Sequence, residues 1–144
     1  MVDPTIIGVE SERITYEIEK GAIRKFAEAI GEENPVYFDE QAAKEQGYPS
    51  LLAPITFPTT FRDYVPDWFN KLDRNRLLHG EQKYTYYERL FAKDIVEVTD
   101  TVVDVFEKEG SNGKMTFIVR KRKGYKNDKL AFEEQMTLII RGGE

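Results

Sequence analysis

Strand-forming sequence fills the second half of the chain, and this feature constrains the fold more than any other. Residues 95–108 contain eight β-branched side chains and neither Gly nor Pro, and residues 83–90 are rich in Tyr and Thr. The last three predicted strands reach about 10–13 residues, against a usual length of about 5–6. Long antiparallel strands twist and curl, and a curled sheet must enclose apolar side chains. The pattern predicts an α+β fold built on a curved antiparallel sheet.

Two turn signals separate these strands. Asn112-Gly113 predicts a two-residue hairpin turn, because both central positions of that turn need a positive φ. A second turn around residues 125–128 leads into the last strand, residues 129–141. On one face of that strand only Glu134 interrupts an apolar row, which consists of Leu130, Phe132, Met136, Leu138 and Ile140.

The first half of the chain combines one short strand with helices. Residues 14–18 alternate apolar and polar side chains, as a half-buried strand does. An apolar stripe at helical spacing follows, made of Ile23, Phe26, Ala27 and Ile30. Gly31 can close this helix in the left-handed conformation, and Asp39 can cap a second helix over residues 40–46 that Gly47 would end. These helical stripes are the expected filling of the curved sheet.

Four prolines, at positions 49, 54, 58 and 66, interrupt the chain between these helices and the strands. Pro58 suits the first turn of a helix continuing through Tyr64, because its missing N–H would have no partner there. Residues 66–80 show no clear period, so we expect a loop or a partly helical excursion.

Composition limits the functional classes. The 144 residues fit one domain, residues 1–144, and a net charge of −5 argues against a nucleic-acid binder, which needs surplus Lys and Arg. The one basic run, residues 120–123, is expected to be the solvated end of a strand. Absence of Cys removes disulfides and thiolate metal sites, and neither a secretion signal nor an apolar stretch of membrane-spanning length is evident. We expect a cytoplasmic protein with no metal site.

The segment Gly31-Glu32-Glu33-Asn34-Pro35-Val36-Tyr37-Phe38-Asp39 resembles the hydratase motif of the MaoC-like hot-dog family, Gly-Asp-x-Asn-Pro-aliphatic-His-x-Asp. Residues 47–58 and 78–94 are similar to the corresponding parts of its first-half, or FAS1-type, dehydratase domains. The resemblance covers nearly the whole chain. It implies a hot-dog fold, in which a curved antiparallel β-sheet wraps around a central α-helix.

Members of this family hydrate trans-2-enoyl thioesters of coenzyme A (CoA) or acyl carrier protein (ACP), or dehydrate (3R)-hydroxyacyl thioesters. The resemblance implies that a carboxylate and an imidazole activate water and move the α-carbon proton. Backbone N–H groups at a helix N-terminus would stabilise the thioester oxygen. It implies no cofactor beyond the CoA or ACP thioester that carries the substrate.

The chain departs from the motif at both chemical positions. Glu32 stands in place of Asp and adds one methylene, and Tyr37 stands in place of His. A phenol has a reference pKa of about 10, against about 6.5 for imidazole, so a phenol is a poor base at neutral pH. Glu32 and Tyr37 therefore occupy the positions of a dyad that is not intact. The candidate substrate-binding residues are Glu32, Asn34, Tyr37, Pro54, Thr56, Phe57 and His79.

His79 and a tyrosine cluster each have two possible roles. His79 is the only histidine and lies outside the motif, so an interface or fold-supporting role is favoured over catalysis. The cluster of Tyr84, Tyr86 and Tyr87 could line an acyl tunnel, but tyrosines on a strand are more often simply packed.

Three functional hypotheses follow. In the first, the chain is the half of a two-subunit dehydratase that lacks the dyad, pairs with a catalytic MaoC-type subunit and shapes the acyl tunnel. In the second, it is a self-sufficient enoyl-CoA hydratase that uses Glu32 with Tyr37 or His79. In the third, it binds acyl thioesters without catalysis. Because a single curled sheet leaves an exposed edge, we expect a homodimer or a heterodimer.

Overall fold

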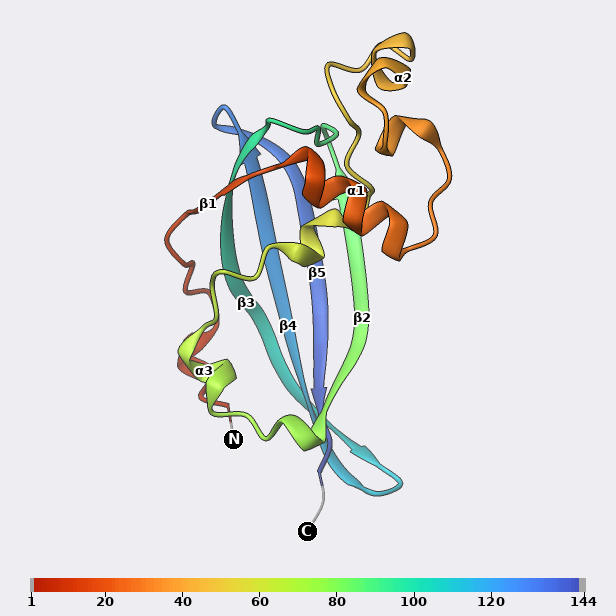
Figure 1. Cartoon of the computed structure of the whole chain (residues 1–144). Helices are drawn as coiled ribbons and strands as arrows, with labels where there is room; N and C mark the ends of the chain where they lie inside the picture. The colour runs from red at the N-terminus through yellow and green to blue at the C-terminus, as the bar shows by residue number, and fades with distance from the viewer. Residues whose placement is uncertain (1, 143–144) are drawn as a thin grey trace.

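Five antiparallel strands form one curved sheet in the computed structural model, which describes residues 2–142 (Figure 1). The strands are β1 (Ile14–Glu17), β2 (Leu77–Tyr86), β3 (Ile95–Gly110), β4 (Gly113–Lys126) and β5 (Lys129–Ile140). Their order in the sheet is β1-β3-β4-β5-β2. The long strands predicted from the sequence are confirmed. Of residues 66–80, expected as a loop or a partly helical excursion, residues 77–80 instead begin β2, because the backbone of residues 77–79 pairs with the end of β5.

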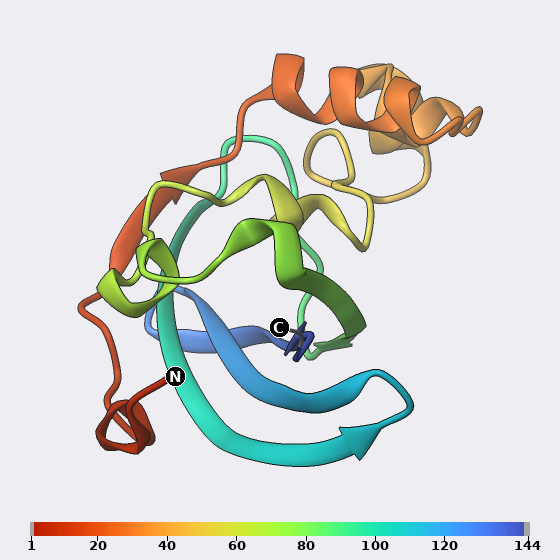
Figure 2. The same cartoon turned by 90° about the horizontal axis from the view of Figure 1, so that it is seen from below.

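The helices are short and lie at one end and on one side of the sheet. They are α1 (Lys20–Ala29), α2 (Glu40–Glu45) and α3 (Asp67–Asn70), with 3-10 turns η1 (Pro4–Ile6), η2 (Pro35–Tyr37), η3 (Phe57–Thr60) and η4 (Arg74–Arg76). α1 and α2 lie near the end of the sheet where the chain passes from β2 to β3 (Figure 1). The segment between α2 and β2 crosses the concave side (Figure 2).

Both hairpin turns form, but the first is displaced by one residue from its expected position. Its central residues are Ser111 and Asn112, and the positive φ falls just after them, on Gly113 (105°). In the second turn, Asn127 and Asp128 both have positive φ, 49° and 61°. These two residues thus have the positive φ angles that we expected at the first turn.

The predicted helix signals are confirmed in α1 and α2, except that Ile30 of the predicted stripe follows α1 and is exposed. Ile23 and Ala27 are fully buried on the inner face of α1. Gly31 follows this helix with a φ of 77°, in the left-handed region. Asp39 caps α2, since its carboxylate accepts a hydrogen bond from the Gln41 backbone N at 2.8 Å.

The segment across the concave side is less helical than the sequence suggests. The expected helix from Pro58 through Tyr64 is wrong, because only the single turn η3 forms there. The hydroxyls of Thr59 and Thr60 donate to carbonyl oxygens three residues earlier, at 2.8 and 2.9 Å. Side-chain bonds of this kind compete with the backbone bonds of a helix.

A β4 side chain also occupies the acceptors that a longer helix would need. Arg122 Nη1 donates to the Phe61 carbonyl at 2.6 Å, and Arg122 Nη2 donates to the Pro58 carbonyl at 2.7 Å. An α-helix continuing past η3 would use these carbonyls for its own N–H groups. Arg122 thus ties η3 and the residue that follows it to β4.

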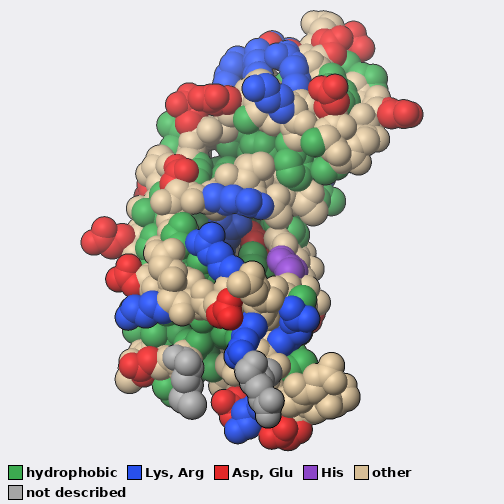
Figure 3. All heavy atoms as spheres, turned by 60° about the horizontal axis from the view of Figure 1, so that its bottom comes forward, with side chains coloured by type: hydrophobic (Ala, Val, Ile, Leu, Met, Phe, Trp, Pro, Cys, Tyr) green, Lys and Arg blue, Asp and Glu red, His purple; other side chains and the backbone are tan. Residues whose placement is uncertain are grey.

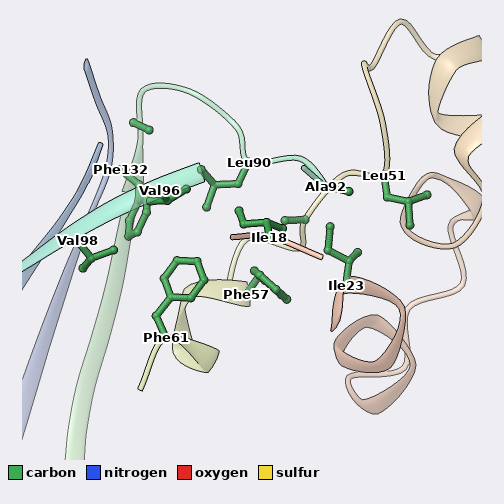
Figure 4. Close-up of a cluster of buried hydrophobic side chains, with 12 residues drawn as sticks. Ile18, Ile23, Leu51, Phe57, Phe61, Leu90, Ala92, Val96, Val98 and Phe132 are labelled. Atoms are coloured by element: carbon green, nitrogen blue, oxygen red, sulfur yellow. The ribbon is translucent and has the colours of Figure 1, made fainter. Parts of the chain in front are cut away.

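The larger hydrophobic core lies where α1, η3 and the end of the sheet meet. Figure 4 shows its principal side chains, which include Ile18, Ile23, Leu51, Phe57, Phe61, Leu90, Val96 and Phe132. Phe132 of β5 is fully buried and places its ring against Gly124 of β4. A Cβ at position 124 would collide with that ring.

Replacing Gly124 with Ala is expected to destabilise the fold by about 1–3 kcal/mol, because the Phe132 ring must leave its packed position. Urea unfolding measures the effect. Gly21→Ala is the matched control: a Cβ there meets open space, and Ala favours the helix by up to about 1 kcal/mol. Equal stability of the Gly124→Ala variant and the unmodified chain would contradict the packing described here.

Glu40 connects three parts of the chain at the α-helical end. Its carboxylate lies 2.6 Å from Lys20 Nζ on α1 and 3.4 Å from Lys93 Nζ before β3, and it accepts a hydrogen bond from Ser50 Oγ at 3.1 Å. Lys20 is the main cause that lowers the pKa of Glu40 to about 2, and Ser50 adds to it. These contacts hold α2 beside α1.

Glu40→Gln is expected to lower the melting temperature at neutral pH. The folded-state pKa lies below the ordinary value of 4.5, so the stabilising contribution is present above that pH and is lost as the pH falls through about 2. Thermal scans from pH 7 to pH 2 should show the difference between the two proteins shrinking below pH 4.5. Glu45→Gln, on the same helix, serves as control. A difference that does not change with pH would refute this role.

Candidate functional site

A cavity of about 530 Å³ lies on the concave side of the sheet, under the segment of residues 59–69. Its volume falls in the range of about 300–1,000 Å³ that small-molecule sites occupy. The apolar part of its wall includes Phe69, Leu77, Met136 and Leu138, and the polar part includes His79, Gln82, Arg122 and Glu134. Figure 3 shows the hollowed surface, with basic side chains inside it and the histidine nearby.

The polar part of the wall is a buried network centred on Glu134. Its carboxylate forms an ion pair with the Arg122 guanidinium and accepts a hydrogen bond from Gln82 Nε2 at 3.1 Å. Glu134 is 1% exposed and the Arg122 side chain 12%. Burial raises the pKa of Glu134, and the charge of Arg122 opposes that shift. The one interruption in the apolar row of β5 is therefore a buried ion-pair partner.

The basic run of β4 is not the solvated strand end that the sequence suggested. β4 continues to Lys126, so the run lies inside the strand, and alternate side chains of the run face the concave side. Arg120 pairs with Asp100 of β3, and its guanidinium lies 5.5 Å from the centre of the Trp68 ring. Two of the four basic side chains are therefore neutralised inside the fold.

The motif residues lie away from this cavity. Glu32, Asn34 and Tyr37 belong to the connection between α1 and α2, and none of them lines the cavity. Asn34 starts η2, because its Oδ1 accepts a hydrogen bond from the Val36 backbone N at 3.1 Å. Glu32 and Tyr37 are half-buried, and within residues 2–142 their side chains form no hydrogen bond with each other.

The remaining predicted site residues divide between core and cavity. Pro54 and Phe57 are buried, and Thr56 is exposed at the start of η3. His79 lines the cavity from β2, next to an irregularity in the pairing with β5. The structure thus brings only His79 of the seven predicted residues to the cavity.

Packing was expected for three tyrosines, and two of them, Tyr84 and Tyr86 of β2, do pack against other side chains. The Tyr86 hydroxyl donates to the Ile55 carbonyl at 2.6 Å, and its ring stacks with that of Tyr84 at 6.3 Å between centroids. Burial raises the pKa of both phenols. Tyr87 is exposed. None of the three lines the large cavity.

Sequence reasoning missed Arg122, Gln82 and Glu134 as parts of the site. The available signal was the alternation of the strands, which places Arg122 on the same side of β4 as Arg120 and Ile118. Opposite them on β5 stands Glu134, the single carboxylate in an otherwise apolar row. A charge at such a position needs a partner, and Arg122 is the residue across from it.

An imidazole, that of His79, and a carboxylate, that of Glu134, both line the cavity, but the carboxylate is paired with Arg122. His79 forms no hydrogen bond with a carboxylate among the residues described. Nor do residues 2–142 contain a group of three or more His, Asp or Glu placed to hold a metal ion. No helix in this part of the chain is long and apolar enough to cross a membrane.

Comparisons with known proteins agree on one family. The model of the FAS1-like dehydratase domain region matches residues 5–134. A UPF0336 protein of Streptomyces avermitilis is 40% identical over 102 residues, which span 67% of this chain and 68% of that protein.

Two solved structures are similar along nearly the whole chain. One is the C-terminally truncated HadBC (3R-hydroxyacyl-ACP dehydratase) complex of Mycobacterium tuberculosis, with a TM-score of 0.79 and 27% identity over 93% of this chain and 96% of that chain. The other is the ChsH1-ChsH2 complex of the same organism, with a TM-score of 0.78 and 21% identity over 93% and 89%. The curved antiparallel sheet with its helix is thus the expected hot-dog fold. The structural neighbours include a chain of a (3R)-hydroxyacyl-ACP dehydratase complex, and this chain belongs to the FAS1-like dehydratase domain family.

Proposed function

We propose that this chain is the half of a (3R)-hydroxyacyl-thioester dehydratase that lacks the catalytic dyad. It encloses the acyl chain of a CoA or ACP thioester, while a second hot-dog subunit supplies the carboxylate and the imidazole. The observation that carries the proposal is the cavity of about 530 Å³ on the concave side, in a chain with Glu32 and Tyr37 at the dyad positions.

The cavity suits an acyl chain because its apolar wall can remove methylenes from water, at about 0.8 kcal/mol for each one fully buried. The charged groups of the cavity do not oppose the burial of methylenes, since Arg122 is paired with Glu134 and Arg120 with Asp100. Neither pair is free to take up the proton that dehydration removes from the α-carbon. The partner's carboxylate and imidazole perform that step, and this chain holds the substrate and excludes water.

The free edge of β2 is the place proposed for the partner. The sheet order leaves β2 as an outer strand of ten residues. An uncovered edge of this length presents unpaired backbone groups that readily pair with another strand. Leu78, on this strand, and Tyr87, just after it, are exposed apolar side chains that a partner would cover. His79 lies on the same strand and would then stand between the cavity and the partner.

Co-expression with a hot-dog protein that carries the intact Asp and His is expected to yield a stable heterodimer that hydrates crotonyl-CoA. The chain alone should show no turnover, because it lacks the dyad. Within the complex, Glu32→Gln and Tyr37→Phe should leave kcat within about threefold, whereas His→Ala in the partner's motif should abolish it. Size-exclusion chromatography and the absorbance of the enoyl thioester are the readouts.

Three results would contradict the proposal, each in a different way. Full activity of the partner alone, with no complex formed, would remove the need for this chain. Turnover by this chain alone that Glu32→Gln or His79→Ala abolishes would establish the self-sufficient hydratase instead. Saturable binding of acyl-CoA without turnover under any condition would establish a non-enzymatic binding module.

The buried pair of Arg122 and Glu134 is expected to matter for cavity shape more than for net stability. Glu134→Leu alone should cost about 3–5 kcal/mol, because it leaves the Arg122 charge buried without its partner. Adding Arg122→Met should restore much of that loss. The double variant should still lower kcat/KM of the complex about tenfold or more, since Met cannot hold the carbonyls of Pro58 and Phe61.

Urea unfolding and turnover of the same preparations separate the two effects. Lys121→Met, on the opposite face of β4, is the control and should change neither quantity appreciably. A double variant with unchanged kcat/KM would show that the hydrogen bonds from Arg122 to the carbonyls of Pro58 and Phe61 do not shape the substrate site.

A further inference from the structure

A second cavity of about 490 Å³ lies beside the first. Its walls come from residues 2–9, from Val102 on β3 and from α3, whose Trp68 lines it. Tyr64 and Pro66 line both cavities. The two spaces are therefore neighbours that share a wall.

One part of this wall is a buried ion pair. Asp100, which lines the second cavity, accepts hydrogen bonds from two nitrogens of Arg120, which lines the first. Their side chains are 8% and 12% exposed, and the Trp68 ring lies 5.5 Å from the guanidinium. The backbone N of Asp100 is also fixed, through a 2.9 Å hydrogen bond to Ser11 Oγ. This part of the wall has little freedom to move.

Tyr64 is the part of the wall that is held by packing alone. It is 37% exposed, and we find no hydrogen bond to its hydroxyl among residues 2–142. Tyr64 and Asp100 both line the second cavity, so this tyrosine lies near the ion pair. Tyr64 thus belongs to the wall of both cavities, and among residues 2–142 we find no polar contact that fixes its hydroxyl.

We propose that Tyr64 sets the longest acyl chain that the first cavity accepts, by closing it off from the second. This inference rests on the function proposed above. An acyl chain that fills the first cavity meets the Tyr64 ring and the Asp100–Arg120 pair. A small side chain at position 64 would join the cavities and let further methylenes leave water against Ile6, Leu72 and Val102. Each methylene buried in this way raises affinity about fourfold.

The test measures kcat/KM of the heterodimer for trans-2-enoyl-CoA substrates of four to twenty carbons. For the unmodified chain and for Tyr64→Phe, kcat/KM should stop rising at the same substrate length, because Phe keeps the ring. For Tyr64→Ala, kcat/KM should continue to rise over several further carbons, by up to about fourfold for each methylene. Tyr64→Val serves in place of the Ala variant if that one unfolds, and melting temperatures of all variants verify the fold.

An identical length limit in the Ala and Phe variants would overturn the proposal, as would a Phe variant that behaves like Ala. If the heterodimer turns over no enoyl-CoA, the proposed function fails and the role of Tyr64 is decided by binding. Calorimetry of saturated acyl-CoA binding to this chain then replaces kcat/KM. A break in affinity with chain length that moves to longer chains in Tyr64→Ala supports the proposal. An unmoved break, or no binding, overturns it.

Discussion

The ion pair between Arg122 and Glu134 is the interaction on which the concave side of this protein depends. One guanidinium neutralises a carboxylate that is 1% exposed and also binds two carbonyls of the crossing segment. It therefore supplies partners for polar groups that would otherwise be buried without them. Arg122 thus fixes η3 and the residue after it relative to β4, across the cavity. A charged side chain thus keeps open a space bordered by apolar residues.

This arrangement has an energetic cost that explains its form. Burying two charges is unfavourable unless the geometry is good and the remaining donors are satisfied. Arg122 meets that condition with the carboxylate and two carbonyls, and Gln82 supplies a further donor to Glu134. The neighbouring pair meets the same condition. Two nitrogens of Arg120 donate hydrogen bonds to Asp100, and the guanidinium lies over the Trp68 ring. The hydrophobic residues of the cavity wall then face charges that are already neutralised.

Features governed by local periodicity could be predicted from the sequence. The strands, α1 and the cap at Asp39 follow from alternation, helical spacing and residue types within a few positions of each other. The crossing segment could not, because its form depends on Arg122, which lies 61 residues along the chain from Phe61. The dyad positions were readable from the motif, but the cavity lies elsewhere. Its polar wall combines β2, β4 and β5, and only the sheet register brings those residues together.

The pairing of the charges also bears on the role proposed for this chain. A guanidinium partner favours the charged form of a carboxylate, whereas burial favours its neutral form. Both influences act on Glu134, whose carboxylate lines the cavity, and burial is the larger one, so its pKa is raised. Separating Glu134 from Arg122 would leave an unpaired charge inside the fold. The pair is therefore needed for the fold, and the proposed division of roles, in which a second subunit moves the proton, leaves it intact.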